Sequence, residues 1–199
     1  MLLDIVILPP DKVRQKISKA VTRATKGLDV ELIVDNKKLI PHLSLFHINT
    51  KKESLSKLEK TIKESILFYT PVSIYQKDLY AEGEGWFGFT LSKHRELTKL
   101  KQRLVVNCYP LKTAMMPWVH KRKPTKLERN NRSKYGVSYN IGKSFWPHFT
   151  LGQMSNEKDA KVVVVRLKGF DFSFKADTVA LCEVNFWHQV TRVLKKFRI

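Results

Sequence analysis

The sequence predicts an α+β fold in a single domain over residues 1–199. Three observations lead to this prediction. The length is close to that of one ordinary domain. A pentapeptide of the pattern Pro-His-apolar-hydroxyl-Leu occurs twice, as Pro41–Leu45 and as Pro147–Leu151, and a helical stretch follows each copy. Further runs rich in β-branched and aromatic residues predict additional strands around these two units.

The first strand is predicted over residues 1–8, an apolar run that carries Asp4 and lacks the basic leader and cleavage site of a signal peptide. Pro9-Pro10 ends this strand and opens a helix that stops at Gly27. A short strand over residues 32–34 precedes the first motif strand, residues 39–47. The apolar residues that recur at helical spacing in the first helix are Val13, Ile17, Val21 and Ala24.

Thr50 and Glu53 have the spacing of a capping box, which predicts the start of a second helix. Residues 71–91 predict a β-hairpin that turns at Gly83-Glu84-Gly85, and a third helix follows. The inward residues of the second helix are Leu55, Leu58, Ile62 and Ile66, and those of the third are Leu97, Leu100 and Leu104.

From residue 108 to residue 146 the periodicity disappears and Lys and Arg become dense, so we predict a basic insertion loop there. The second motif strand comes next. Residues 156–166 predict a helix, although four consecutive valines at 162–165 favour a strand in the same place. Three strands complete the chain, over residues 170–174, 178–184 and 189–197.

Charge is the strongest compositional signal. The chain has 37 Lys and Arg against 18 Asp and Glu, a formal charge of +19 and a pI near 10.0. Such an excess predicts a polyanionic partner, with a solvated lysine-rich surface as the alternative. No apolar run is long enough to cross a bilayer, and Cys108 and Cys182 show no CxxC spacing. We therefore expect a cytoplasmic protein with reduced thiols and no membrane partner.

The repeated pentapeptide carries the chemistry. On a strand, alternation places His42 and Ser44 on one face, and His148 and Thr150 on one face. One His-x-Ser/Thr is expected by composition alone, but requiring the flanking Pro and Leu in both copies lowers a coincidence to under about one in a thousand. Two imidazoles can share acid and base roles near neutral pH without a metal. Two hydroxyls can donate to the non-bridging oxygens of a phosphate.

These motifs resemble those of the 2H (two-histidine) phosphoesterases, which carry two His-x-Ser/Thr copies. The resemblance implies a two-lobed, pseudo-symmetric α+β fold with the two motif strands adjacent at a central cleft. It also implies metal-independent catalysis without a cofactor, in which His148 activates water and His42 protonates the departing 3′ oxygen of a 2′,3′-cyclic phosphate. Ser44 and Thr150 would bind the phosphate. Cleavage of an ordinary diester, or joining of ends, would exchange the two histidine roles.

Other residues are candidates for holding the nucleic acid. Phe46 shares the phase of His42 and Ser44 and is either a base-stacking residue or a hydrophobic rim residue. Continued alternation points His47 away from the site. A zinc site is not expected, because the motifs offer only two nitrogen ligands. Aromatic and basic residues before the second motif form a further candidate for RNA binding: Arg132, Lys134, Tyr135, Tyr139, Lys143 and Trp146.

The sequence thus predicts an RNA phosphoesterase that acts on 2′,3′-cyclic phosphate or 2′,5′-phosphodiester bonds. The alternatives are a 2′-5′ RNA end-joining ligase on the same site and a non-catalytic RNA-binding protein on this scaffold. The charge of +19 exceeds what a cyclic mononucleotide requires, which favours an RNA or oligonucleotide partner. We expect a monomer, although the sequence does not fix the oligomeric state.

Overall fold

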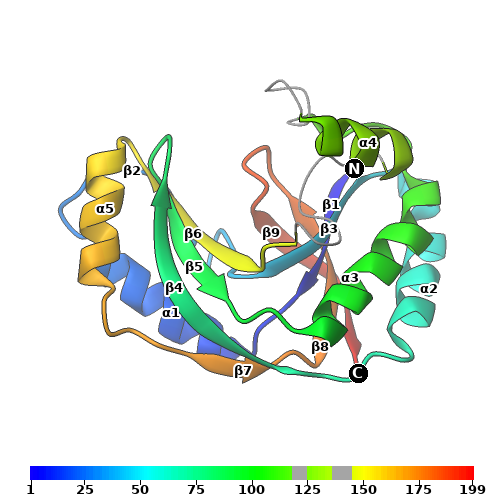
Figure 1. Cartoon of the computed structure of the whole chain (residues 1–199), viewed down its shortest axis with the longest axis horizontal. Helices are drawn as coiled ribbons and strands as arrows, with labels where there is room; N and C mark the ends of the chain where they lie inside the picture. The colour runs from blue at the N-terminus through cyan, green and yellow to red at the C-terminus, as the bar shows by residue number, and fades with distance from the viewer. Residues whose placement is uncertain (118–124, 136–144) are drawn as a thin grey trace.

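The computed structural model describes residues 1–117, 125–135 and 145–199, and two curled sheets face each other in it (Figure 1). One sheet has the strand order β3-β1-β8-β9 and the other has the order β2-β6-β5-β4-β7. Every named strand pair is antiparallel. The strands are β1 (Leu2–Ile7), β2 (Val30–Ile33), β3 (Leu43–Asn49), β4 (Ser73–Glu82), β5 (Trp86–Leu91), β6 (His148–Met154), β7 (Ser173–Lys175), β8 (Thr178–Val184) and β9 (Val190–Arg198).

Helices cover the outer faces of both sheets (Figure 1). Helix α3 contacts β3 of the first sheet and carries α2 on its other side, whereas α5 contacts β4, β5 and β6 of the second sheet. The helices are α1 (Asp11–Ala24), α2 (Leu55–Ile66), α3 (Arg95–Cys108), α4 (Lys126–Tyr135) and α5 (Glu157–Arg166), with short 3-10 turns at Lys52–Ser54 and Tyr109–Leu111. The expected two-lobed α+β architecture is confirmed.

Helix α5 shows how local signals outweigh residue propensity. The Asn156 side chain accepts a hydrogen bond from the Asp159 N–H at 2.9 Å and so caps the first turn. Ala160 and Val163 are fully buried on the face that packs against the sheet. The predicted helix is confirmed despite its four valines, because the N-cap and the buried face offset their preference for a strand.

Two expectations for the first half of the chain and the insertion were wrong. Thr50 does not cap α2, since its hydroxyl donates to the Leu111 carbonyl at 2.7 Å and a 3-10 turn separates it from the helix. The segment over 108–146 is not a loop throughout its described part, because α4 lies within it and Met116 is buried. The remaining residues, 118–124 and 136–144, lie outside the described part of the structure.

No helix within the described ranges has both the length and the apolar character needed to cross a membrane. Both cysteines are buried free thiols.

Candidate functional site

The two motif histidines lie where the two sheets meet. His42 directly precedes β3, and His148 is the first residue of β6. The strands belong to different sheets and contact each other across the junction (Figure 1). This contact brings the two motif strands together. Burial lowers the pKa of His42, and His148 is one of the charges that lower it further, so the two rings share one electrostatic environment. The cleft expected between the strands stays a prediction.

Both imidazoles are held by the same backbone contact. Nδ1 of His42 lies 2.7 Å from the Ile40 carbonyl oxygen, and Nδ1 of His148 lies 2.9 Å from the Trp146 carbonyl oxygen. A carbonyl can only accept, so each Nδ1 carries the proton and donates it. In the neutral ring each Nε2 consequently presents a lone pair, the form that a proton-transfer group requires.

Asp4 lies beside the first histidine, and the sequence analysis did not assign it a role. It is fully buried on β1, and its Oδ2 lies 3.8 Å from Nε2 of His42 and 3.3 Å from Nε2 of His47. Burial raises the pKa of Asp4 to about 6, against the opposing effects of His42, the Ser44 hydroxyl and Lys101. A charged residue in an otherwise apolar strand was the sequence signal for this site.

The expectation that His47 points away from the site was wrong. The register between β1 and β3 shifts at Leu45, so that Ile5 pairs with Phe46 while Val6 pairs with Ser44. This β-bulge inserts one residue and reverses the alternation beyond it. His47 consequently lies beside the Asp4 carboxylate, as His42 does. Burial lowers the pKa of His47 to about 3, and Lys101 contributes to the shift.

The same bulge removes Phe46 from the candidate base-binding residues. Its side chain is 3% exposed and belongs to the main hydrophobic core. A base cannot stack on a ring that is covered on both faces, so the stacking interpretation of Phe46 was wrong. Strict alternation from Ser44 would have kept Phe46 on the site face, and only the extra residue turns it inward.

Lys101 on α3 is a second buried charge that sequence reasoning missed. It is 5% exposed, its Nζ donates to the Leu45 carbonyl, and its Nζ lies 4.9 Å from the centre of the Phe145 ring. Burial lowers the pKa of Lys101 to about 8, with Asp4 acting in the opposite direction. Lys101 stands four residues after Leu97 on the apolar stripe of its helix, and this position was the available signal.

The second histidine has aromatic neighbours instead. The Trp146 ring stacks on the His148 ring at 4.5 Å between centroids and 24° between planes, and the Tyr80 ring meets the His148 ring edge-on at 6.0 Å. Burial raises the pKa of Tyr80, whereas a hydrogen bond with the Thr150 side chain lowers it. Burial also lowers the pKa of His148, and Lys101 lowers it further. Trp146 is 40% exposed, and its ring also contacts the Tyr80 ring at 5.0 Å between centroids.

Gly88 on β5 makes room for this arrangement. A Cβ at this position would lie 2.1 Å from the Phe149 carbonyl oxygen and 2.6 Å from the Tyr80 hydroxyl. Any side chain there would displace either the motif strand or the tyrosine that contacts Thr150. The close approach of β4, β5 and β6 at this point therefore requires glycine.

The remaining predicted residues are only partly placed. Ser44 and Thr150 are both half-buried beside their histidines. Arg132 and Tyr135 are half-buried on α4, where the Tyr135 ring meets the Tyr109 ring edge-on at 6.3 Å. Tyr139 and Lys143 lie outside the described residues, as does the side chain of Lys134. The expected RNA-binding role of this group stays a prediction.

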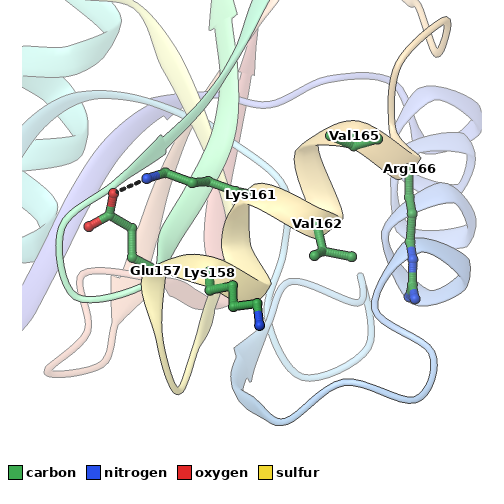
Figure 2. A pocket seen from close by; sticks show the side chains of 6 residues that line it. All are labelled: Glu157, Lys158, Lys161, Val162, Val165 and Arg166. Carbon is green, nitrogen blue, oxygen red and sulfur yellow. Dashed lines mark ion pairs between the residues drawn. The ribbon is translucent and has the colours of Figure 1, made fainter.

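A pocket of about 690 Å³ lies elsewhere, along the outer side of α5 (Figure 2). Lys161 and Glu157 form an ion pair of 2.7 Å at one end of it. None of the motif residues lines this pocket. Across the described ranges, no group of three or more His, Cys, Asp and Glu residues is arranged to hold a metal ion.

Comparison with known proteins identifies the fold. No protein-family model matches the chain, and no curated protein matches it either. Solved structures do match over nearly the whole length. TT0787 of Thermus thermophilus has a TM-score of 0.66 at 16% identity and covers 100% of this chain and 97% of its own. LigT of E. coli complexed with 3′-AMP has a TM-score of 0.60 at 14% identity and covers 99% and 96%.

A third structure, described as a phosphoesterase, has a TM-score of 0.57 at 13% identity and covers 99% of this chain and 97% of its own. The chain therefore has the two-lobed fold of the 2H phosphoesterases. The resemblance first carried by two pentapeptides is confirmed at the level of the whole fold.

Proposed function

We propose that this protein is a metal-independent RNA phosphoesterase that hydrolyses 2′,3′-cyclic phosphate or 2′,5′-phosphodiester bonds through His42 and His148. The matching orientation of the two imidazoles carries the proposal, since both rings donate from Nδ1 to a carbonyl and keep Nε2 for proton transfer. The likeness in fold to LigT, whose crystal structure contains 3′-AMP, supports a nucleotide substrate. The charge of +19 supports an RNA chain.

The neighbours of the two histidines support different roles for them. Although burial lowers the pKa of both rings, Asp4 opposes that shift at His42 and favours its protonated form. Lys101 reinforces the shift at His148 and favours its neutral form. A protonated imidazole is the general acid and a neutral one is the general base. This arrangement supports His42 as the acid and His148 as the base in hydrolysis.

In the proposed step, His148 takes up one proton and His42 releases one. Nε2 of His148 accepts a proton from water while the water oxygen forms a bond to phosphorus. The bond from phosphorus to the 3′ oxygen of a 2′,3′-cyclic phosphate breaks, and His42 donates its Nε2 proton to that oxygen, which leaves a 2′-phosphate. The hydroxyls of Ser44 and Thr150 donate to the non-bridging oxygens, whose charge grows in the transition state.

The test is direct incubation of the pure protein with two substrates in the presence of EDTA. One is RNA that ends in a 2′,3′-cyclic phosphate, and the other is 2′,5′-linked oligoadenylate. We expect turnover of at least one, with products identified by mass spectrometry. His42→Ala and His148→Ala should each abolish turnover and leave RNA affinity largely intact. Turnover that EDTA abolishes would contradict the metal-independent mechanism.

The alternatives give different outcomes in the same experiment. A ligase would join the cyclic-phosphate RNA to an added strand with a 5′-hydroxyl end, because that hydroxyl can attack the phosphorus in place of water with the same two proton transfers. A non-catalytic RNA-binding protein would retain the RNA and release no product under any of these conditions.

A further inference from the structure

The turn between β8 and β9 presents two large aromatic side chains to solvent. Phe186 is 70% exposed and Trp187 is 47% exposed. The turn itself is braced, because the Asn185 side chain accepts hydrogen bonds from the N–H groups of Trp187 and Gln189, each at 3.0 Å. Scattered exposed hydrophobic residues need no explanation, but adjacent exposed aromatic rings on an ordered turn indicate a contact surface.

Trp187 is joined to the other sheet by a third aromatic residue. Its ring lies 6.1 Å from the ring of Trp86, with 56° between the planes. Trp86 is the first residue of β5, whereas Trp187 precedes β9 of the opposite sheet. The aromatic group formed by Trp86, Phe186 and Trp187 therefore spans both lobes.

This aromatic group is continuous with the catalytic site on the first lobe. His188, next to Trp187, meets the His47 ring edge-on at 5.8 Å between centroids. His47 in turn shares the Asp4 carboxylate with His42. The chain neighbour of the exposed tryptophan, His188, thus contacts the side chain that shares a carboxylate with the first motif histidine.

On the second lobe, the aromatic group lies well away from the reacting phosphate. Trp86 pairs with Gln153 of β6, five residues beyond His148. At the rise of a β-strand this separation is roughly 17 Å. A base at Trp86 and Trp187 is too far from a phosphate at His148 to be the base attached to it, so it belongs to a nucleotide further along the chain.

We propose that Trp86, Phe186 and Trp187 form a second base-stacking subsite for single-stranded RNA, so that the substrate of this enzyme is an oligonucleotide. The proposal rests on the function proposed above. Aromatic rings stack on any base, and the strong positive charge of the chain attracts the polyanion that carries the bases. Glu82 and Glu84, both exposed at the tip of the β4–β5 hairpin, disfavour phosphate there, which agrees with a subsite that holds bases.

The test compares a short and a long substrate in the full chain. We would measure kcat/KM for a 2′,3′-cyclic mononucleotide and for an oligonucleotide of about eight residues that ends in the same cyclic phosphate. Trp187→Ala should lower the ratio of oligonucleotide to mononucleotide kcat/KM by about tenfold to a hundredfold. Trp187→Phe should restore part of the ratio, because it keeps a ring. Phe68→Ala removes an aromatic residue that is 79% exposed elsewhere and should leave both values unchanged.

Binding is measured separately, by the anisotropy of a labelled oligonucleotide, so that the subsite is tested even if no substrate is turned over. A lower affinity in Trp187→Ala than in Phe68→Ala supports the subsite in that case. An unchanged ratio and an unchanged affinity would overturn the proposal. So would an equal loss on both substrates, or a change of molecular mass in sedimentation, which would make the aromatic group an interface between copies of the chain.

Discussion

The two halves of the site have the same backbone arrangement and different surroundings. Around His42 the neighbours are buried charged and polar groups, Asp4 and His47, whereas around His148 they are the aromatic rings of Tyr80 and Trp146. Lys101 affects the pKa of a residue on each side, Asp4 beside His42 and His148 itself. A repeated motif thus supplies two equivalent groups, and their neighbours make them inequivalent. An acid and a base need that difference.

The largest expected effect separates the two histidines. On the natural leaving group, His42→Ala and His148→Ala should each lower kcat by at least about a hundredfold. On an aryl phosphodiester, whose leaving group needs no proton, His42→Ala should recover most of its activity and His148→Ala should not. Steady-state kinetics on both substrates checks this. Recovery in His148→Ala instead would reverse the two roles.

A second prediction concerns the buried charges of the first half. Lys101→Met removes a buried cation that favours the charged form of the fully buried Asp4, so we expect the free energy of unfolding to fall by about 3 kcal/mol in urea denaturation at pH 7. The double variant with Asp4→Asn should regain part of the loss. Lys99→Met, a half-exposed lysine on the same helix, is the matched control and should change little. An equal loss in Lys99→Met would show that the helix, and not the buried charge, is responsible.

A third prediction uses the opposite signs of two pKa shifts. Burial lowers the pKa of His47 to about 3, so the unfolded chain binds its proton first and this group makes stability fall as the pH drops below about 6.5. Burial raises the pKa of Asp4 to about 6, so the folded chain binds that proton first and stability from this group rises as the pH drops from about 6 to 4. The two contributions oppose each other in this window.

Asp4→Asn should therefore lose stability more steeply than the parent between pH 6 and pH 4, by up to about 1.4 kcal/mol per pH unit. His47→Gln should lose it less steeply than the parent. Denaturation in urea at a series of pH values measures both slopes. Parallel slopes in all three proteins would refute the assignment of these protons.

The smallest expected effect concerns the aromatic neighbours of His148. Tyr80→Phe removes the hydroxyl that bonds to Thr150, and we expect kcat to fall by about twofold to tenfold. Tyr75→Phe on the same strand removes a hydroxyl whose side chain is 49% exposed and is the control. A larger loss than that of Thr150→Ala would mean that the tyrosine takes part in the reaction more directly than through Thr150.

Much of the fold could be predicted from the sequence, because local patterns encode it. The strand over 178–184 was predicted at the bounds that β8 has, and the hairpin over 71–91 contains β4 and β5. Errors arose where a distant contact replaced a local one. Thr50 has the spacing of a capping residue, but its hydroxyl donates a hydrogen bond to the Leu111 carbonyl, 61 residues away.

Four side chains at the site show the same difference between what local patterns encode and what distant contacts decide. His42 and His148 could be found from the sequence because the motif is contiguous and occurs twice. Asp4 and Lys101 could be recognised only as charges in apolar patterns, since nothing local shows that one faces His42 and that the other reaches the Leu45 carbonyl from a different element.

The amino-acid order by itself determined the α+β class, the repeated histidine and hydroxyl pairs and the excess of positive charge. These follow from periodicity and composition, which act over a few residues at a time. Only the tertiary structure decided which groups surround each histidine. One inserted residue at Leu45 reverses the faces of β3, and the packing of α3 on β3 brings Lys101 near Asp4, because register and packing depend on contacts between distant parts of the chain.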